Sequence, residues 1–272
     1  MTSTSNRPAT TQSMHPAARP RPAWLDGVNP VTKIALALLL SVPLFASIDP
    51  VSALVAIALQ LVCLPLTGLP VRTVLLRLLP IALFSPIAGL SMLLYAEPEG
   101  EVFFSFGFAA ISEGSIALAV AVTLRVIALG LPTILLFGRT DPTELGDALA
   151  QVAHLPSRFV LGALAGARML GLFLDDWRTM SLARRARGVG DHGALRRFFS
   201  MAFVLLVFAV RRGTKLAMAM EARGFGSGIE RTWSRPSRLR LRDGVALLGG
   251  AAIMALAIAG AVAAGVFRFV WS

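Results

Sequence analysis

Long apolar runs, separated by short polar segments, dominate the pattern of this 272-residue chain. A helix needs about 20 apolar residues to cross the hydrocarbon core of a bilayer. Five runs reach or approach that length, at 34–48, 51–66, 74–95, 115–137 and 245–270. The pattern therefore predicts an all-α, polytopic membrane protein with about five transmembrane helices.

Two further apolar runs, 159–174 and 198–210, lie in a strongly basic part of the chain. If both crossed the membrane, the six arginines between 175 and 197 would lie outside the cell. Positively charged loops remain in the cytoplasm. We therefore expect both runs to belong to long helices packed beneath the membrane core, with partial entry into the core as the open alternative.

The charges of the loops predict an orientation. The loop at 96–113 contains four glutamates and no basic residue, whereas the region 138–243 contains 18 basic residues. The positive-inside rule then places the N-terminus and 138–243 in the cytoplasm. Five spans place the C-terminus outside. We expect a multi-pass protein of the cytoplasmic membrane.

The chain divides into four predicted parts. Residues 1–23 are rich in Ser, Thr, Pro and Ala and are expected to be disordered. Residues 24–137 form a membrane domain with the first four spans, residues 138–243 form long cytoplasmic helices, and residues 244–272 form the last transmembrane helix.

Composition supports a membrane protein over a soluble one. Hydrophobic residues make up 56% of the chain and charged residues 15%, against about 25% charged in soluble domains. The net charge of +11 fits cytoplasmic loops beside a lipid bilayer, so we expect no nucleic-acid partner. The single cysteine, Cys63, cannot form an internal disulfide.

Signals for three helices lie between 138 and 243. Asp141 followed by Pro142 marks a helix start, because aspartate caps the first turn and proline suits the first helical position. A second helix is expected from after Pro156 to Arg187. A third is expected from about Ala194 to Arg223.

The second and third of these helices end in the same motif. Residues 186–190 read ARGVG and residues 222–226 read ARGFG. The helix dipole favours an arginine in the last turn, and the glycine after it ends the helix. One such end is an ordinary capped helix, but two copies predict a pair of matched docking tips. Arginine suits an acidic groove because its planar fork binds carboxylates in bidentate fashion.

These motifs resemble those of the transmembrane T component of energy-coupling factor (ECF) transporters. The resemblance covers about 25–233, and its most specific parts are LARRARG at 182–188 and LAMAMEARGFG at 216–226. Supporting matches are NPVTK at 29–33, EG at 113–114, TLR at 123–125 and DPTELGDAL at 141–149. The family often has aspartate where this chain has Asn29.

The resemblance implies a mechanism. Each motif would contact one of two ABC ATPase subunits, and the membrane part would hold a separate substrate-binding S component. Closure of the ATPases would move the helix tips and import a vitamin or a metal ion. The implied ATPase-coupling residues are Ala186, Arg187, Gly188, Ala222, Arg223 and Gly224, with Arg184, Arg185 and Glu221 in support.

Arg125 is the one charged residue deep in a predicted span. A central arginine costs about 2.5–3.5 kcal/mol on insertion scales, so such residues usually face the interior of the bundle. We expect Arg125 to support the membrane domain by bonding to backbone carbonyls or polar side chains.

The sequence predicts no catalytic site. A Walker A loop requires Gly-Lys-Ser/Thr, and neither lysine, Lys33 nor Lys215, lies in that pattern. We expect no cofactor in this chain, with ATP bound by partner subunits. The three histidines are scattered without ligand spacing, so we expect no metal site: His15, His154 and His192.

Two other functions stay open as alternatives. A membrane-bound phosphate-handling enzyme usually needs clustered acids for a metal, and Asp175-Asp176 is the only adjacent acidic pair. A secondary transporter would need several polar residues at mid-membrane, and the first, second and fifth spans contain very few. Co-purification with two ATPase chains would favour the T component.

Overall fold

The computed structural model describes residues 23–47, 49–95, 102–106, 109–188, 193–226, 232–233 and 235–265. The predicted disordered segment therefore lies outside the described residues, except for Ala23. The described chain is almost entirely helical, which confirms the predicted class. Its elements are η1 (Trp24–Gly27), α1 (Pro30–Ala46), α2 (Pro50–Val62), α3 (Leu64–Thr67), α4 (Val71–Tyr95), β1 (Val102–Phe106), β2 (Ala109–Ser112), α5 (Glu113–Phe137), α6 (Pro142–Gln151), α7 (Ser157–Ala186), α8 (Ala194–Ala222) and α9 (Leu241–Ala263).

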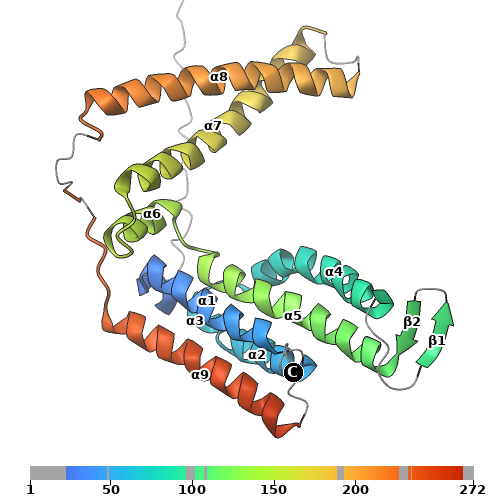
Figure 1. The fold of residues 1–272 in the computed structure, drawn as a ribbon. Helices are drawn as coiled ribbons and strands as arrows, with labels where there is room; N and C mark the ends of the chain where they lie inside the picture. The colour runs from blue at the N-terminus through green and yellow to red at the C-terminus, as the bar shows by residue number, and fades with distance from the viewer. Residues whose placement is uncertain are drawn as a thin grey trace, which may run out of the picture.

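The helices form two separate groups (Figure 1). The first is a bundle in which α1 and α2 pack against both α5 and α9, while α4 packs along the other side of α5. The second is the pair α7 and α8, which cross each other away from the bundle. The short helix α6 contacts both α1 and α7 and so joins the two groups.

Side-chain caps fix where α1 and α6 begin. Asn29 accepts a hydrogen bond from the backbone N–H of Val31 at 3.0 Å, so asparagine caps α1 in the place where the family often has aspartate. Asp141 caps α6 by accepting from the backbone N–H of Thr143 at 2.8 Å, which confirms that predicted helix start. Asp243, near the start of α9, accepts from the backbone N–H of Asn29 at 2.7 Å. This bond ties the first turns of α1 and α9 together.

Leucine and small residues fill the core of the bundle. Leu36, Leu40 and Leu44 of α1 are buried against alanines of the other helices. Helix α4 packs on α5, and large apolar side chains of α4 are exposed, including Leu79 and Leu83. An apolar outer surface over a packed interior is expected of helices surrounded by lipid.

Four helices of the described chain are long and apolar enough to cross a membrane: α4, α5, α7 and α9. Three of these correspond to the predicted spans at 74–95, 115–137 and 245–270. The first two predicted spans form the shorter helices α1 and α2, of 17 and 13 residues. Since α7 qualifies by length and composition, the count of five spans and the position of α7 beneath the membrane stay predictions.

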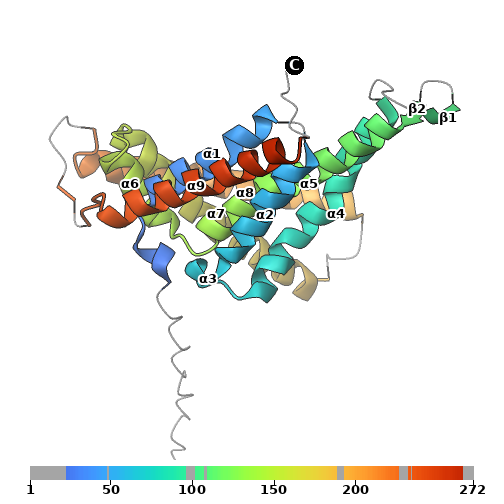
Figure 2. The same cartoon turned by 90° about the horizontal axis from the view of Figure 1, so that it is seen from below.

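The loop predicted to lie outside contains a small β-hairpin, which the Sequence analysis did not predict. Strands β1 and β2 pair antiparallel, with an irregularity in register between Val102 and Phe104. The hairpin projects beyond the start of α5, where β2 contacts both α5 and α4 (Figures 1 and 2). It is a local addition to an all-helical fold.

Helices α4 and α5 approach most closely at Gly89. A Cβ atom added to Gly89 would lie 2.7 Å from the backbone oxygen of Ala119 and would also meet the Thr123 hydroxyl. Gly89 is buried, and Thr123 already donates to the same Ala119 oxygen at 2.8 Å. The close contact between the two helices therefore requires glycine at this position.

We expect Gly89→Ala to destabilise the membrane bundle. Overpacking against a backbone atom costs about 1–3 kcal/mol, and the melting temperature of the purified protein should fall accordingly. Gly213→Ala is the matched control, because a Cβ at Gly213 meets nothing within 4 Å and alanine favours a helix. Equal melting temperatures of the two variants would contradict the packing argument.

Candidate functional site

The two predicted tips have the same backbone conformation. Arg187 follows the last residue of α7 with φ −90° and ψ 6°, and Arg223 follows the last residue of α8 with φ −91° and ψ 12°. In each case the next residue is a glycine with positive φ, +68° at Gly188 and +80° at Gly224. The sequence repeat is therefore also a structural repeat.

Backbone hydrogen bonds close both helix ends in the same way. Gly188 donates to the carbonyl of Arg185 at 3.0 Å, and Gly224 donates to the carbonyl of Glu221 at 2.9 Å. At the end of α8, Phe225 also donates to the carbonyl of Met220 at 3.0 Å, which completes a Schellman motif. This motif needs a residue in the left-handed region, and glycine adopts that region without steric cost.

Both arginine side chains are available to a partner. Arg187 and Arg223 are exposed, as are the alanines before them and the glycines after them. Within the described chain neither guanidinium makes a hydrogen bond or an ion pair. Each tip therefore presents a positive charge to solvent.

Polar and aromatic contacts hold α7 and α8 together where they cross. Arg184 donates to the Ser200 hydroxyl at 2.8 Å, and the rings of Trp177 and Phe198 lie 5.5 Å apart. Further along, Arg212 pairs with Asp176, with 3.0 Å between nitrogen and oxygen, and lies over the ring of Phe173. These contacts fix the angle between the two helices.

The tips lie at opposite ends of this crossed pair. The bond from Arg184 to Ser200 places the end of α7 beside the first turns of α8. The rise of α8 from Ser200 to Arg223 is about 35 Å at 1.5 Å per residue. The Arg223 end is also tied to the start of α7, because Arg158 donates to the backbone oxygen of Gly226 at 2.7 Å.

The supporting residues take different places. Arg184 is part of the crossing, whereas Arg185 and Glu221 are exposed beside the tips. Asp176, from the adjacent acidic pair of the sequence, forms an ion pair with Arg212. The sequence offered no signal for the partners Ser200 and Arg212, which depend on the crossing angle.

Arg125 faces the interior of the bundle, as expected, and its side chain is 9% exposed. The predicted bonds to carbonyls or polar groups are absent at two of its nitrogens. Neither Nε nor Nη2 has a hydrogen-bond partner within the described chain. Arg125 is more than 60 residues from either tip in sequence and belongs to a different group of helices.

Comparison with known proteins matches the sequence of this chain to a known family. The profile of the cobalt transport protein family, CbiQ, matches residues 22–233. This chain is a member of that family. The range includes both tips and every helix of the described chain except α9.

Several curated relatives are named energy-coupling factor transporter transmembrane protein EcfT. The protein from Exiguobacterium sibiricum is 30% identical over 82% of this chain and 89% of its own length. The protein from Limosilactobacillus fermentum is 26% identical over 82% and 88%. That from Thermanaerovibrio acidaminovorans is 28% identical over 89% and 92%. The chain is thus the transmembrane component of an ECF transporter and a multi-pass membrane protein.

Proposed function

We propose that this T component couples two ATPase subunits to a substrate-binding S component through its two helix tips. Each tip binds one ATPase, with Arg187 and Arg223 entering acidic grooves. ATP-driven closure of the ATPase pair changes the distance between the tips and thereby the geometry of the crossed helices. That movement acts on the S component, which imports a vitamin or a metal ion.

The observation that carries this proposal is the structural identity of the tips. Two exposed arginines with the same backbone geometry, each followed by a glycine with positive φ, fit two copies of one binding groove. A separation of about 35 Å lets two separate partners bind side by side. The closing of such a pair would then move both ends of the crossed helices toward each other.

The apolar surface of the crossed pair supports a membrane partner. Large side chains of α7 and α8 are more than half exposed near the crossing: Leu170, Leu174, Phe199, Phe203 and Leu206. Exposed apolar patches of this kind mark interaction sites with proteins or membranes. We assign this surface to the S component, which binds between the crossed helices and the bundle.

Purification of the complex tests the proposal. The full chain carrying an affinity tag is isolated from native membranes in mild detergent, and the co-purifying chains are identified by mass spectrometry. We expect two ATP-binding chains, or two copies of one, together with a small membrane protein. Isolation of the chain alone, under conditions that preserve other membrane complexes, would contradict the assignment.

The proposed orientation is tested by cysteine labelling in intact cells. In a Cys63→Ser background, single cysteines replace Phe103 in the hairpin, Leu195 at the start of α8 and Ala264 after α9. An impermeant thiol reagent should label positions 103 and 264 only. Labelling at 195 would contradict the cytoplasmic position of the tips and would favour α7 as a membrane span.

A further inference from the structure

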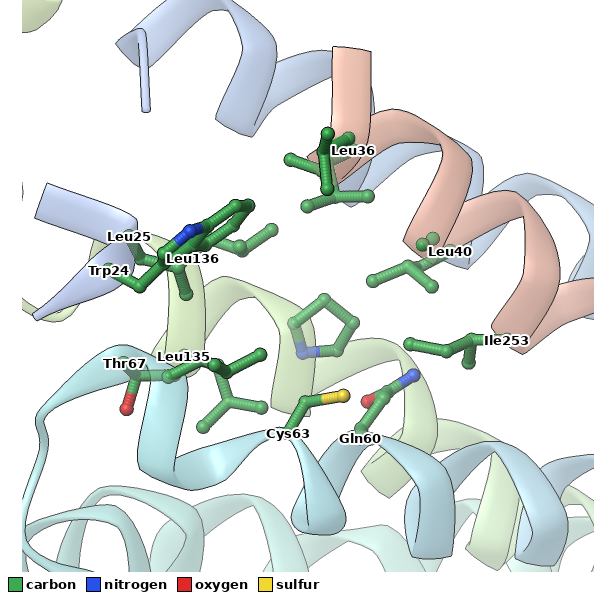
Figure 3. A pocket seen from close by; sticks show the side chains of 16 residues that line it. Trp24, Leu25, Leu36, Leu40, Gln60, Cys63, Thr67, Leu135, Leu136 and Ile253 are labelled. Carbon is green, nitrogen blue, oxygen red and sulfur yellow. The ribbon is translucent and has the colours of Figure 1, made fainter. Parts of the chain in front are cut away.

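A cavity of about 370 Å³ lies inside the membrane bundle (Figure 3). Neither α7 nor α8, which end in the tips, lines it. Its walls come from η1, α1, α2, α3, α5 and α9. Ligand sites in proteins usually have volumes of about 300–1,000 Å³. The cavity is therefore large enough for a small ligand or for one end of a larger one.

The lining of the cavity carries no charged residue. Leucine, isoleucine, proline and glycine account for most of it. Among its few polar residues, Thr67 already uses its hydroxyl, which donates to the Leu64 carbonyl at 2.8 Å and accepts from the Leu69 N–H at 3.1 Å. A charged ligand would lose its hydration without compensation here, so the cavity suits a neutral molecule.

Gln60 is the exception in this apolar lining. Its side chain is 2% exposed, and neither Oε1 nor Nε2 has a hydrogen-bond partner within the described chain. The amide lies at the wall of the cavity beside Cys63, near Leu40 and Ile253 (Figure 3). A buried amide without partners costs free energy that a ligand can recover by hydrogen bonding.

The cavity opens sideways at the surface of the bundle. Leu66 of α3 and Val245 of α9 are 46% and 58% exposed, and Gly249 is exposed beside them. The opposite wall is closed by buried side chains of α1 and α5, such as Leu40 and Leu136. A ligand therefore enters between α3 and α9, from the lipid that surrounds the helices.

We propose that this cavity binds a neutral lipid of the bilayer whose single carbonyl or hydroxyl group hydrogen-bonds to Gln60. The lipid enters with its polar end first, and its apolar tail extends out of the cavity through the opening beside Gly249. A carbonyl accepts from Nε2, and a hydroxyl can also donate to Oε1. Phospholipids do not fit, because their charged heads stay at the membrane surface and a plain acyl chain leaves Gln60 unpaired.

The test uses 1-dodecanol and dodecane as probes and the reactivity of Cys63 as the readout. Cys63 is the only cysteine of the chain and lines the cavity, so its rate of alkylation by N-ethylmaleimide reports whether the cavity is filled. The full chain is placed in nanodiscs, and each probe is added at equal mole fraction of the lipid. We expect dodecanol to slow alkylation at about five-fold lower mole fraction than dodecane does. One neutral hydrogen bond to Gln60 strengthens binding by about this factor.

Two variants separate head recognition from simple filling of space. Gln60→Leu removes the unpaired amide at similar size, so the protein should fold and the advantage of dodecanol over dodecane should vanish. Gly249→Leu places a side chain at the opening, where a Cβ meets nothing within 4 Å, and should slow alkylation without any probe. Gly244→Leu is the matched control on α9, since it is equally open but does not line the cavity.

Three results would overturn the proposal. Equal protection by dodecanol and dodecane would show an apolar void without recognition of a head group. Protection by neither probe would show that the cavity is closed or is filled by a protein partner. Unchanged dodecanol preference in Gln60→Leu would show that the amide does not bind the hydroxyl. All three are independent of whether the tips bind ATPases.

Discussion

Replacing Arg187 and Arg223 together by alanine should nearly abolish ATPase binding and substrate uptake while leaving the protein in the membrane. Both side chains are exposed and make no hydrogen bond or ion pair within the described chain, so their removal should not destabilise the fold. A hydrogen bond to a charged group contributes about 1.5–3 kcal/mol. Each single variant should therefore bind the ATPases about 10–100-fold more weakly.

The control for this experiment is Arg178→Ala. Arg178 lies on α7 before the tip, with 77% of its side chain exposed, and forms an ion pair with Asp175 one turn earlier. Arg184 is a poor control, because its bond to Ser200 holds the crossing of α7 and α8. ATPase co-purification and uptake are measured at equal membrane expression. If the double alanine variant retains both, the tips do not couple and the matched ends are ordinary helix caps.

Lysine at either position should restore part of the binding. It keeps the positive charge but lacks the planar fork that binds a carboxylate in bidentate fashion. Full recovery of ATPase binding with lysine would show that the partner grooves require only a positive charge and not the planar guanidinium group.

Valine at both Gly188 and Gly224 should weaken coupling although both arginines remain. The two glycines have φ of +68° and +80°, where an ordinary residue costs about 1–2 kcal/mol. A β-branched side chain is disfavoured further in that region. The chain after each arginine would then leave its native path, and ATPase affinity should fall about ten-fold per tip.

Asparagine at the same two positions is the matched comparison, because it adopts positive φ more readily than valine does. A Cβ at Gly188 meets nothing within 4 Å, so a difference between valine and asparagine there reports backbone conformation and not a clash. Binding of purified ATPase subunits to each variant gives the ratio. Equal losses with valine and asparagine would assign the effect to side-chain bulk at the partner surface.

Local chemistry made the helix ends predictable. Asp141 begins α6 and the Arg-Gly pairs end α7 and α8, each within a residue or two of the expected position. These signals act within a single turn, through caps and the conformational freedom of glycine, so they are readable from neighbouring residues. The ARGVG and ARGFG repeat therefore predicts the candidate site from local sequence alone.

Features that depend on contacts between distant segments were not predictable. Nothing adjacent to Gly89 indicates the carbonyl of Ala119, and nothing adjacent to Arg184 indicates Ser200. Gln60 is unpaired because, within the described chain, the side chains packed around it in three dimensions provide no hydrogen-bond donor or acceptor within reach. The hairpin did have a local signal, because short runs rich in Phe, Val and Ile flank Gly107, which is typical of paired strands.

The two tips differ in how firmly the chain around them is anchored. Beyond Arg223, Gly226 is held by Arg158, and the amide of Gln151 pairs with the backbone of Arg235 and Ser237 just before α9. The Arg187 end, by contrast, is braced through the crossing with α8. The Arg187 end is therefore supported by the first turns of α8, whereas the Arg223 end is supported by the first turn of α7. If the proposed ATPases move by equal amounts, they would therefore act on two helix ends with different supports, and the crossed pair would deform unequally at its two ends.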